Sequence, residues 1–268
     1  MRSTTLLATT HGLPVHEAVR LLSAATSKPR TELLVGTDIT SDEYSAFTSM
    51  VRRRIDHEPL QYLEGSVPFG PVDVVVDERV LVPRPETEYL FELVMQRCAA
   101  LNVVVDLCTG SGNLALALKA AYPDAAVYAT DLSADAADLA RSNAARNALE
   151  VTVMTGDLFN PLPSRLRGSV DLIVANPPYL ARRELADVPA DVRREPEMAL
   201  VAGPEGDEVI RRIAEAAGDW VAPCGLVAIE VSEFHAASVA EYFDGATVTV
   251  VPDLTGRDRF VLAVFPSE

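Results

Sequence analysis

A chain of 268 residues, 49% of them hydrophobic, is long enough for one large domain or for a large domain with a small one. Its formal net charge of −16 argues against nucleic acid as a partner, because such affinity depends on basic side chains that neutralise phosphates. Three widely spaced cysteines, no membrane-length apolar run and no signal-peptide core favour a cytoplasmic protein without disulfides, membrane contact or a metal site.

Apolar residues at helical spacing predict three helices near the N-terminus. We expect them at 14–26, at 31–35 and from Ser41 to about residue 55. Ser41 is the expected N-cap of the third helix, whose first turn is acidic and whose last turn carries three arginines, as the helix dipole favours. Residues 1–62 are therefore predicted to form a small helical domain.

From residue 65 onward the pattern becomes that of strands. Two β-branched runs, at 72–76 and 79–82, are expected to pair as a hairpin, which gives a linker over residues 63–83. The stretch Pro83-Arg84-Pro85-Glu86-Thr87-Glu88 follows, and its two prolines restrict the backbone. It leads into a helix predicted to run from about residue 87 to 100.

A βαβ unit comes next. A strand at 103–107 leads through the turn Cys108-Thr109-Gly110-Ser111-Gly112 into a helix at 114–121 and a second strand at 126–130, which ends at Asp131. The glycines let backbone N–H groups approach a ligand at a helix N-terminus, and Asp131 is placed to accept hydrogen bonds from two ribose hydroxyls. The same spacing also fits a dinucleotide-binding fold, so this unit alone leaves the cofactor open.

The remaining elements alternate as in a parallel α/β sheet. They are expected at 133–147, 151–155, 170–175, 207–217, 226–231 and 235–243, with a closing antiparallel pair at 247–251 and 259–265. After the third strand, Asp157 could receive an adenine amino group while Leu158 covers the ring, or Asp157 could cap a local turn. Residues 180–206 form a long polar loop of the kind that often serves as a lid.

The tetrapeptide Asn176-Pro177-Pro178-Tyr179 directly follows the expected strand at 170–175. The prolines stop that strand because they give no N–H to the ladder, so Asn176 is held at a carboxyl strand end, where open α/β sheets bind ligands. The Asn176 side-chain oxygen and the Pro177 carbonyl can both accept hydrogen bonds from one NH2 group. Neither can protonate it, so its lone pair stays free to attack an electrophile. Tyr179 offers a flat face to a planar group. A plain proline-rich surface turn is the alternative.

Two features favour group transfer over hydride transfer: Asp106, two residues before the glycine-rich turn, and the tetrapeptide. A hydride-transfer enzyme has no evident use for acceptors that hold an NH2 group. Three segments then resemble the HemK/PrmC family: 80–88, 106–112 and 176–179. The similarity extends over about residues 15–265. Members of that family are S-adenosyl-L-methionine-dependent methyltransferases, which methylate the side-chain amide of the glutamine in the Gly-Gly-Gln loop of peptide chain release factors.

The resemblance implies a class I, Rossmann-like methyltransferase sheet over residues 84–268, with the helical domain taking part in substrate recognition. The cofactor-binding residues it implies are Asp106, Cys108, Thr109, Gly110, Ser111, Gly112, Asp131, Leu132, Asp157, Leu158 and Asn176. The acceptor nitrogen is assigned to Asn176, Pro177, Pro178 and Tyr179, of which Asn176, Pro177 and Tyr179 are the expected catalytic residues. Since the methyl group on a sulfonium is already activated, positioning is the main contribution expected of the enzyme.

Three features depart from the family pattern. The helical domain is shorter by about one helix, Cys224 stands where a glycine is expected before the fifth strand, and Ser232 stands where a glycine usually follows that strand.

Other functions fit parts of the same pattern. A small-molecule N-methyltransferase could act on a planar NH2 group such as the guanidinium of free arginine, for which the acidic balance and Glu86 or Glu88 near the pocket would be suited. A non-catalytic binding module would keep the cofactor fold without needing the tetrapeptide. A DNA adenine methyltransferase shares the tetrapeptide, but this chain has no basic face. The acidity could also serve solubility alone.

Overall fold

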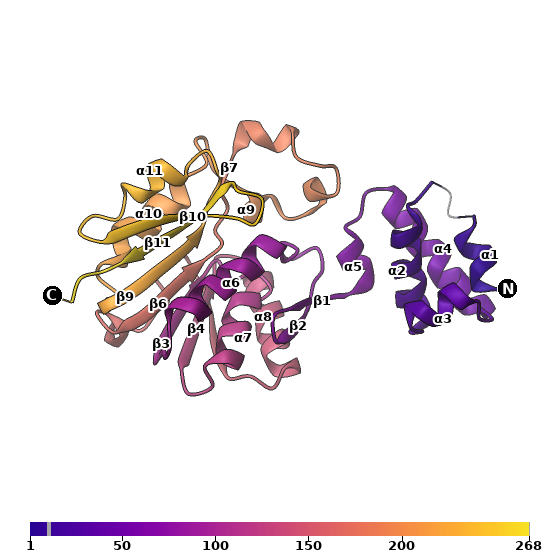
Figure 1. The fold of residues 1–268 in the computed structure, drawn as a ribbon, viewed down its shortest axis with the longest axis horizontal. Helices are drawn as coiled ribbons and strands as arrows, with labels where there is room; N and C mark the ends of the chain where they lie inside the picture. The colour runs from indigo at the N-terminus through magenta and orange to yellow at the C-terminus, as the bar shows by residue number, and fades with distance from the viewer. Residues whose placement is uncertain (10–11, 268) are drawn as a thin grey trace. The chain divides into compact units, whose positions relative to one another are not determined.

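The computed structural model describes residues 1–9 and 12–267, and the chain divides into two compact units (Figure 1). The first unit consists of Met1–Ser66 with Pro189–Arg194, and the second of Val67–Val188 with the residues from Glu195 onward. The middle of the loop expected at 180–206 therefore belongs to the first unit. Within the described residues, no helix combines the length and the apolar character needed to cross a membrane.

Five α-helices belong to the first unit in the part of the chain that the structure describes. They are α1 (Ser3–Leu7), α2 (Val15–Thr26), α3 (Arg30–Val35), α4 (Ser41–Ile55) and α5 (Leu60–Glu64). Leu21, Leu22 and Leu33 are fully buried among them and form the centre of this unit's core. The three expected helices are confirmed. The pattern does not predict α1 and α5, because helices of 5 residues are too short to show apolar periodicity.

The N-cap of α4 is Thr40, so the expected cap at Ser41 is wrong by one residue. The Thr40 hydroxyl accepts a hydrogen bond from the Glu43 backbone N–H (3.2 Å), and the Glu43 carboxylate accepts one from the Thr40 N–H (2.8 Å). This reciprocal capping box needs an acid three residues after the cap, and Glu43 meets that requirement only for Thr40.

A hairpin follows the helices, and all of it except Ser66 belongs to the second unit. It consists of β1 (Ser66–Phe69) and β2 (Val72–Val75), which form a two-stranded sheet. The strand expected at 79–82 is wrong. The Asp77 carboxylate accepts the backbone N–H of Arg79 (3.1 Å), and Glu195 accepts that of Val82 (2.8 Å). Because carboxylates take these donors, the β-branched run cannot offer them to a neighbouring strand.

The main sheet of the second unit has the strand order β10-β11-β9-β6-β3-β4-β5 among the described residues (Figure 1). Its strands are β3 (Val103–Leu107), β4 (Ala126–Asp131), β5 (Val151–Thr155), β6 (Val170–Ala175), β9 (Val221–Glu230), β10 (Thr247–Pro252) and β11 (Asp258–Val264). Pairing is parallel from β5 through β9, and β11 runs antiparallel to both β9 and β10. The expected α/β sheet with an antiparallel closing pair is confirmed.

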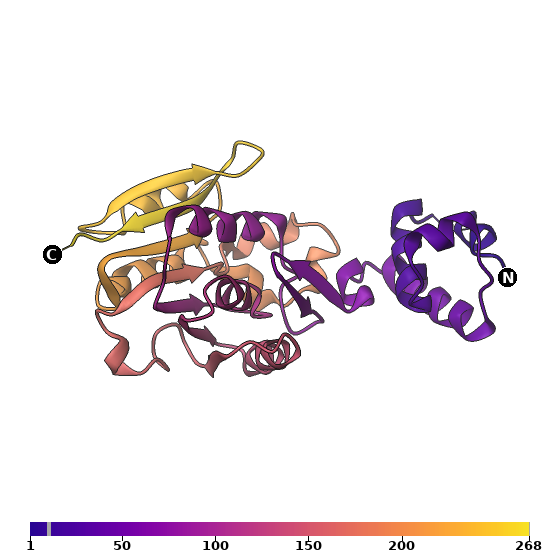
Figure 2. The ribbon, with the colours of Figure 1, turned by 60° about the horizontal axis from the view of Figure 1, so that its bottom comes forward.

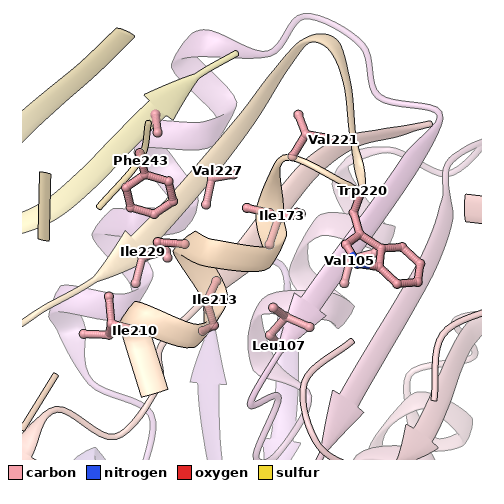
Figure 3. Close-up of a cluster of buried hydrophobic side chains, with 14 of the residues drawn as sticks. Val105, Leu107, Ile173, Ile210, Ile213, Trp220, Val221, Val227, Ile229 and Phe243 are labelled. Carbon is pink, nitrogen blue, oxygen red and sulfur yellow. The ribbon is translucent and has the colours of Figure 1, made fainter. Parts of the chain in front are cut away.

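Helices cover both faces of this sheet (Figures 1 and 2). On one face lie α6 (Pro85–Arg97), α7 (Asn113–Ala121) and α8 (Ala134–Arg146), and on the other α10 (Glu208–Ala217) and α11 (Ala236–Ala240). Leu107 and Ile229 are fully buried in the core that includes Ile213 of α10 (Figure 3). Side chains alternate along a strand, so the neighbouring Asp106 and Glu230 point toward α6 and α7.

Because helices cover both faces of the sheet, β3 and β6 are apolar and buried on both sides. The polar residues near the strand ends distinguish the two faces. A slip of β3 by one residue would turn Asp106 to the opposite face, away from its bonds to Thr109 and Ala115.

Strand β9 begins at Val221, before the start expected at residue 226, and passes through Cys224, whose φ is 62°. That left-handed conformation is one that glycine adopts without a steric penalty, which is the physical reason for expecting a glycine at this position.

The segment expected as a long loop contains short regular elements. They are β7 (Leu180–Ala181), the 3-10 helices η2 (Arg182–Ala186) and η3 (Val192–Arg194), α9 (Glu197–Leu200) and β8 (Val201–Gly203); another 3-10 helix, η1 (Ser164–Leu166), precedes β6. Strands β7 and β8 pair in parallel. The buried Glu195 side chain accepts hydrogen bonds from Val82 N and from Arg84. The ends of the segment are thereby fastened within the second unit.

Candidate functional site

A cavity of about 380 Å³ lies at the carboxyl ends of β3, β4, β5 and β6. Every expected cofactor-binding residue except Gly112 lines it, namely Asp106, Cys108, Thr109, Gly110, Ser111, Asp131, Leu132, Asp157, Leu158 and Asn176. Pro178 also lines the cavity, as do several residues that the sequence interpretation missed: Arg79, Thr87, Met198 and Arg212. The structure thus brings motifs from four strand ends to one cavity.

The two glycines of the turn have different roles. Gly110 has a φ of 54°, and a Cβ there would meet nothing within 4 Å, so its backbone is open to the cavity. Gly112 has a φ of 82° and is the N-cap of α7; a Cβ on it would lie 3.2 Å from Ala140 Cβ. Gly112 therefore lets α7 pack against α8. Cys108 also lies in the turn, and burial raises the pKa of its thiol well above the usual value, so the thiol stays neutral.

Asp106 has one carboxylate oxygen in use and one without a partner. Its Oδ2 accepts hydrogen bonds from the Thr109 hydroxyl (2.5 Å) and from Ala115 N (3.1 Å). Its Oδ1 is buried and has no hydrogen-bond partner among the described residues. Burial raises the pKa of Asp106 to about 7, against which the bonds from Thr109 and Ala115 act. A buried acceptor without a partner is costly, so this oxygen is suited to a donor group on a ligand.

Asp131 fixes the turn and keeps spare acceptor capacity. Its Oδ2 accepts from Gly110 N (2.8 Å), and its Oδ1 accepts from Ser133 N (2.9 Å). Burial raises the pKa of Asp131, and these two backbone bonds oppose the shift. Because each carboxylate oxygen can accept two hydrogen bonds, both can also receive ligand hydroxyls. Asp157, which lines the next part of the cavity, accepts from Arg212 Nη2 (2.5 Å) on α10.

The Asn176 carboxamide is oriented by one hydrogen bond. Its Nδ2 donates to the Thr87 hydroxyl oxygen (2.9 Å), while its Oδ1 is buried and has no hydrogen-bond partner within the described chain. Since Asn176 and Pro178 line the cavity, the carboxamide is placed where a substrate NH2 group could reach its oxygen. Pro177 and Tyr179 are not among the lining residues.

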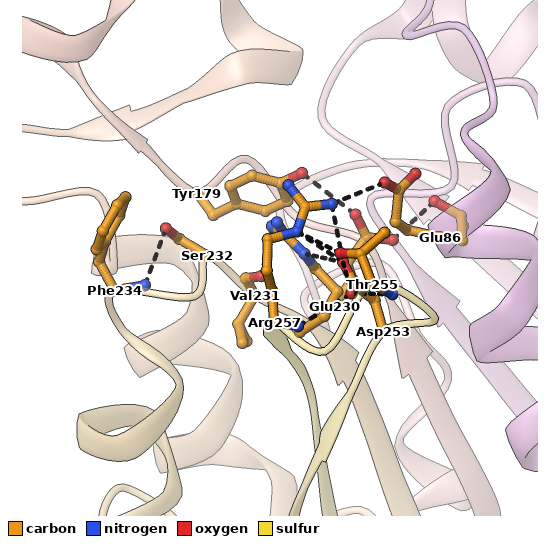
Figure 4. Close-up of polar contacts among 11 residues, drawn as sticks. Glu86, Tyr179, Glu230, Val231, Ser232, Phe234, Asp253, Thr255 and Arg257 are labelled. Carbon is orange, nitrogen blue, oxygen red and sulfur yellow. Dashed lines mark hydrogen bonds and ion pairs between the residues drawn. The ribbon is translucent and has the colours of Figure 1, made fainter.

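Tyr179 is tied to the end of β9 (Figure 4). Its hydroxyl donates to Glu230 Oε1 (3.2 Å), and the Arg259 guanidinium carbon lies 5.8 Å from the centre of its ring. The Thr87 hydroxyl donates to the other oxygen, Glu230 Oε2 (2.7 Å). Burial raises the pKa of Glu230 to about 7, although the bond from Thr87 and the charge of Arg259 lower it. Stacking of the Tyr179 ring on a substrate remains a prediction.

Glu86 and Glu88 have other partners. Glu86 Oε1 accepts from Arg257 Nη2 (3.4 Å; Figure 4), and Glu88 Oε1 accepts from Gly70 N (2.9 Å). Neither lines the cavity, whereas Thr87 between them does. Thr87 could have been found from its position in the proline-containing stretch 83–88. Glu230 could have been found as an acid at the end of an expected strand, which is also the pattern that predicts Asp131.

The architecture and the site define a class of protein. A parallel sheet closed by an antiparallel strand, with a glycine-rich turn after its first main strand and an Asn-Pro-Pro-Tyr at the fourth, is that of a class I methyltransferase. Two solved structures share the fold. A methyltransferase from Pyrococcus furiosus matches with a TM-score of 0.56 and 22% identity over 74% of this chain and 90% of that one. One chain of an E. cuniculi complex responsible for the methylation of the termination factor eRF1 matches with a TM-score of 0.52 and 20% identity, over 70% of this chain and 99% of that one.

Sequence comparison makes the assignment more specific. Residues 86–200 match the model of the methyltransferase small domain, and residues 2–65 match that of the PrmC N-terminal domain. The release factor glutamine methyltransferase of Deinococcus radiodurans is 40% identical over 93% of this chain and 91% of its own length. That of Mycolicibacterium smegmatis is also 40% identical, over 97% and 93%. The chain belongs to the release factor glutamine methyltransferase family and is a methyltransferase.

Proposed function

We propose that the protein uses S-adenosyl-L-methionine to methylate the side-chain amide of the glutamine in the Gly-Gly-Gln motif of peptide chain release factors. The observation that carries this proposal is the Asn176 carboxamide, whose oxygen is free beside the cavity at a strand end. The names of the relatives at 40% identity support the same acceptor.

The cavity residues suit the proposed cofactor. Asp106 Oδ1 has no other partner and could accept from the cofactor's amino group, and the open space beside Gly110 leaves room for the cofactor to lie against the backbone. Asp131 would hold the ribose hydroxyls, and Asp157 with Leu158 would hold the adenine. S-adenosyl-L-methionine supplies a methyl group bonded to a positively charged sulfur, which makes the methyl carbon electrophilic.

The tetrapeptide would hold the acceptor amide. Asn176 Oδ1 and the Pro177 carbonyl would each accept one N–H of the glutamine side chain, which fixes the plane of the NH2 group. Neither oxygen can give up a proton, so the nitrogen stays neutral, and its proton can leave after the methyl group is transferred. Holding reacting atoms in line can contribute about 7–11 kcal/mol to a reaction, so positioning alone can account for a large acceleration.

The contacts of Glu86 and Glu88 do not support methylation of free arginine. It needed Glu86 or Glu88 in the pocket, and both side chains bond elsewhere and lie outside the cavity lining.

A labelling experiment tests the proposal. Purified protein is given S-adenosyl-L-methionine with a labelled methyl group, together with a release factor, the same release factor with its motif glutamine replaced by alanine, or free arginine. We expect label on the first only. Label on arginine with none on the release factor would overturn the proposed acceptor.

Asn176→Ala provides the matched enzyme variant. We expect its single-turnover rate to fall by about a hundredfold or more, because the nucleophile loses a positioning group, while cofactor affinity changes little. Methyl transfer near the wild-type rate would remove Asn176 from the acceptor site.

A further inference from the structure

A continuous chain of hydrogen bonds leads from the end of β9 to the cavity. Glu230 Oε2 accepts from the Thr87 hydroxyl (2.7 Å), and the Thr87 oxygen accepts from Asn176 Nδ2 (2.9 Å). Thr87 and Glu230 are each 1% exposed, so water does not compete for these bonds. Thr87 lies on α6. Asn176, 89 positions later, directly follows β6, and Glu230, 143 positions after Thr87, ends β9.

The direction of this chain decides which way the Asn176 carboxamide points. A threonine hydroxyl has a single proton. While Glu230 is ionised it can only accept, so Thr87 donates this proton to Glu230. The Thr87 oxygen is then left as an acceptor, and only the NH2 side of Asn176 can bond to it. The carboxamide oxygen must therefore face the cavity. The reverse orientation would present an NH2 group to a substrate NH2 group, and two donors cannot pair.

The same carboxylate holds the other end of the tetrapeptide. Glu230 Oε1 accepts from the Tyr179 hydroxyl (3.2 Å; Figure 4). The guanidinium carbon of Arg259 lies 5.8 Å from the centre of the Tyr179 ring. Glu230 therefore holds the tetrapeptide at both ends, Tyr179 directly and Asn176 through Thr87. The prolines between them restrict the backbone, so the tetrapeptide is fixed at both ends.

We propose that Thr87 and Glu230 are positioning residues for methyl transfer, which keep the Asn176 carboxamide oxygen directed at the acceptor nitrogen. This inference rests on the proposed function, because it takes the acceptor to be an NH2 group held by Asn176. Thr87 acts through Asn176, because its hydroxyl is already engaged with Glu230 and Asn176.

Thr87→Val and Thr87→Ser form a matched pair, because valine keeps the shape of threonine without the hydroxyl and serine keeps the hydroxyl. We expect Thr87→Val to lower kcat about ten- to a hundredfold, with KM for the release factor and cofactor affinity within about threefold of wild type. Thr87→Ser should stay close to wild type. Thr87→Ala, which also lacks the hydroxyl, serves as a second variant should Thr87→Val fail to fold. Wild-type kcat in a folded variant without the hydroxyl would overturn the inference.

A double-mutant cycle separates positioning from a merely structural role. If Thr87 acts through Asn176, then Thr87→Val should cost nothing further in an Asn176→Ala background. Independent losses that multiply would contradict the inference.

An activity-free readout keeps this test separate from the proposed function. The side-chain NH2 of Asn176 can be followed by nitrogen-15 NMR and assigned by its loss in Asn176→Ala. We expect its protons to exchange slowly with water in wild type and Thr87→Ser, and at least about tenfold faster in Thr87→Val, because the buried bond is lost. If the wild-type protein does not methylate a release factor, the proposed acceptor is wrong. The exchange rates still show whether Thr87 holds the Asn176 side chain. Equal rates in all three proteins would overturn the inference.

Discussion

At the scale of single residues, the site depends on buried carboxyl groups whose protonation is altered by their surroundings. Burial raises the pKa of Asp106 and of Glu230 to about 7. Both lie at the ends of parallel strands on the face toward α6 and α7. Ionising these two groups in the folded protein costs free energy. For Asp106 the cost is not offset at Oδ1, which is buried and has no hydrogen-bond partner among the described residues.

Asp106→Asn tests this cost through pH. Because the folded-state pKa is raised from 3.8 to about 7, the folded state binds the proton more tightly, so the stabilising contribution of Asp106 is complete below about pH 4 and is lost as pH rises to 7. Wild type should therefore lose about 3 kcal/mol relative to Asp106→Asn over that interval. Urea unfolding at several pH values, followed by Trp220 fluorescence, measures the difference. If the difference in the free energy of unfolding between the two proteins did not change with pH, the pKa of Asp106 would not be raised in the folded state.

Asp131→Ala tests the ribose assignment. We expect S-adenosyl-L-methionine to bind about 1–3 kcal/mol more weakly, because a charge-assisted acceptor is lost together with its bonds to Gly110 N and Ser133 N. Calorimetry measures the affinity directly. Asp138→Ala is the control, since Asp138 is an exposed acid of α8 paired with Arg141 and lies outside the cavity lining. Equal affinities for all three proteins would exclude Asp131 from the cofactor site.

At the scale of elements, the sequence predicts features that depend on residues close together in the chain. Short apolar runs predicted the parallel strands, and the residues at their ends, Asp131 and Asn176, could be placed from the strand pattern alone. Thr87 and Glu230 could not, because their roles arise from contacts across 89 and 143 positions. The false strand at 79–82 has the same cause: its Val82 N–H is taken by Glu195, 113 positions away.

Glu195 shows how one buried side chain can order a long segment. Glu195→Ala would leave Val82 N–H and the Arg84 guanidinium without this acceptor, so local opening of residues 182–206 should become easier by about 2 kcal/mol. Trypsin should then cut at the arginines of this segment at least about tenfold faster. Glu197→Ala is the control, because its pair with Arg182 is exposed and contributes little. Identical cleavage of the two variants would show that Glu195 does not hold the segment.

At the scale of the whole molecule, the two units have separate cores within the described residues. The core of the first unit is centred on Leu21, Leu22 and Leu33. The core of the second unit lies on both faces of the sheet, between the sheet and α10 on one face and around Leu116 and Leu172 on the other. Residues 189–194 belong to the first unit although they come from the segment between β7 and β8. Within that unit, Arg54 Nη1 lies 3.6 Å from Asp191 Oδ2, and Arg194 pairs with Asp56.

Deleting residues 1–62 tests the expectation, implied by the family resemblance, that the helical domain takes part in recognising the protein substrate. The cavity residues all belong to the second unit, so cofactor affinity should stay within about threefold of wild type if the remaining sheet is folded, which circular dichroism and Trp220 fluorescence can check. Contacts far from the reacting atom mainly lower KM, so the KM for a release factor should rise about tenfold or more while turnover at saturation falls less. Arg54→Ala in the full chain is a milder variant, which removes the pairs with Glu17 and Asp191 without removing the domain. An unchanged KM in the folded deletion variant would show that the sheet unit recognises the release factor alone.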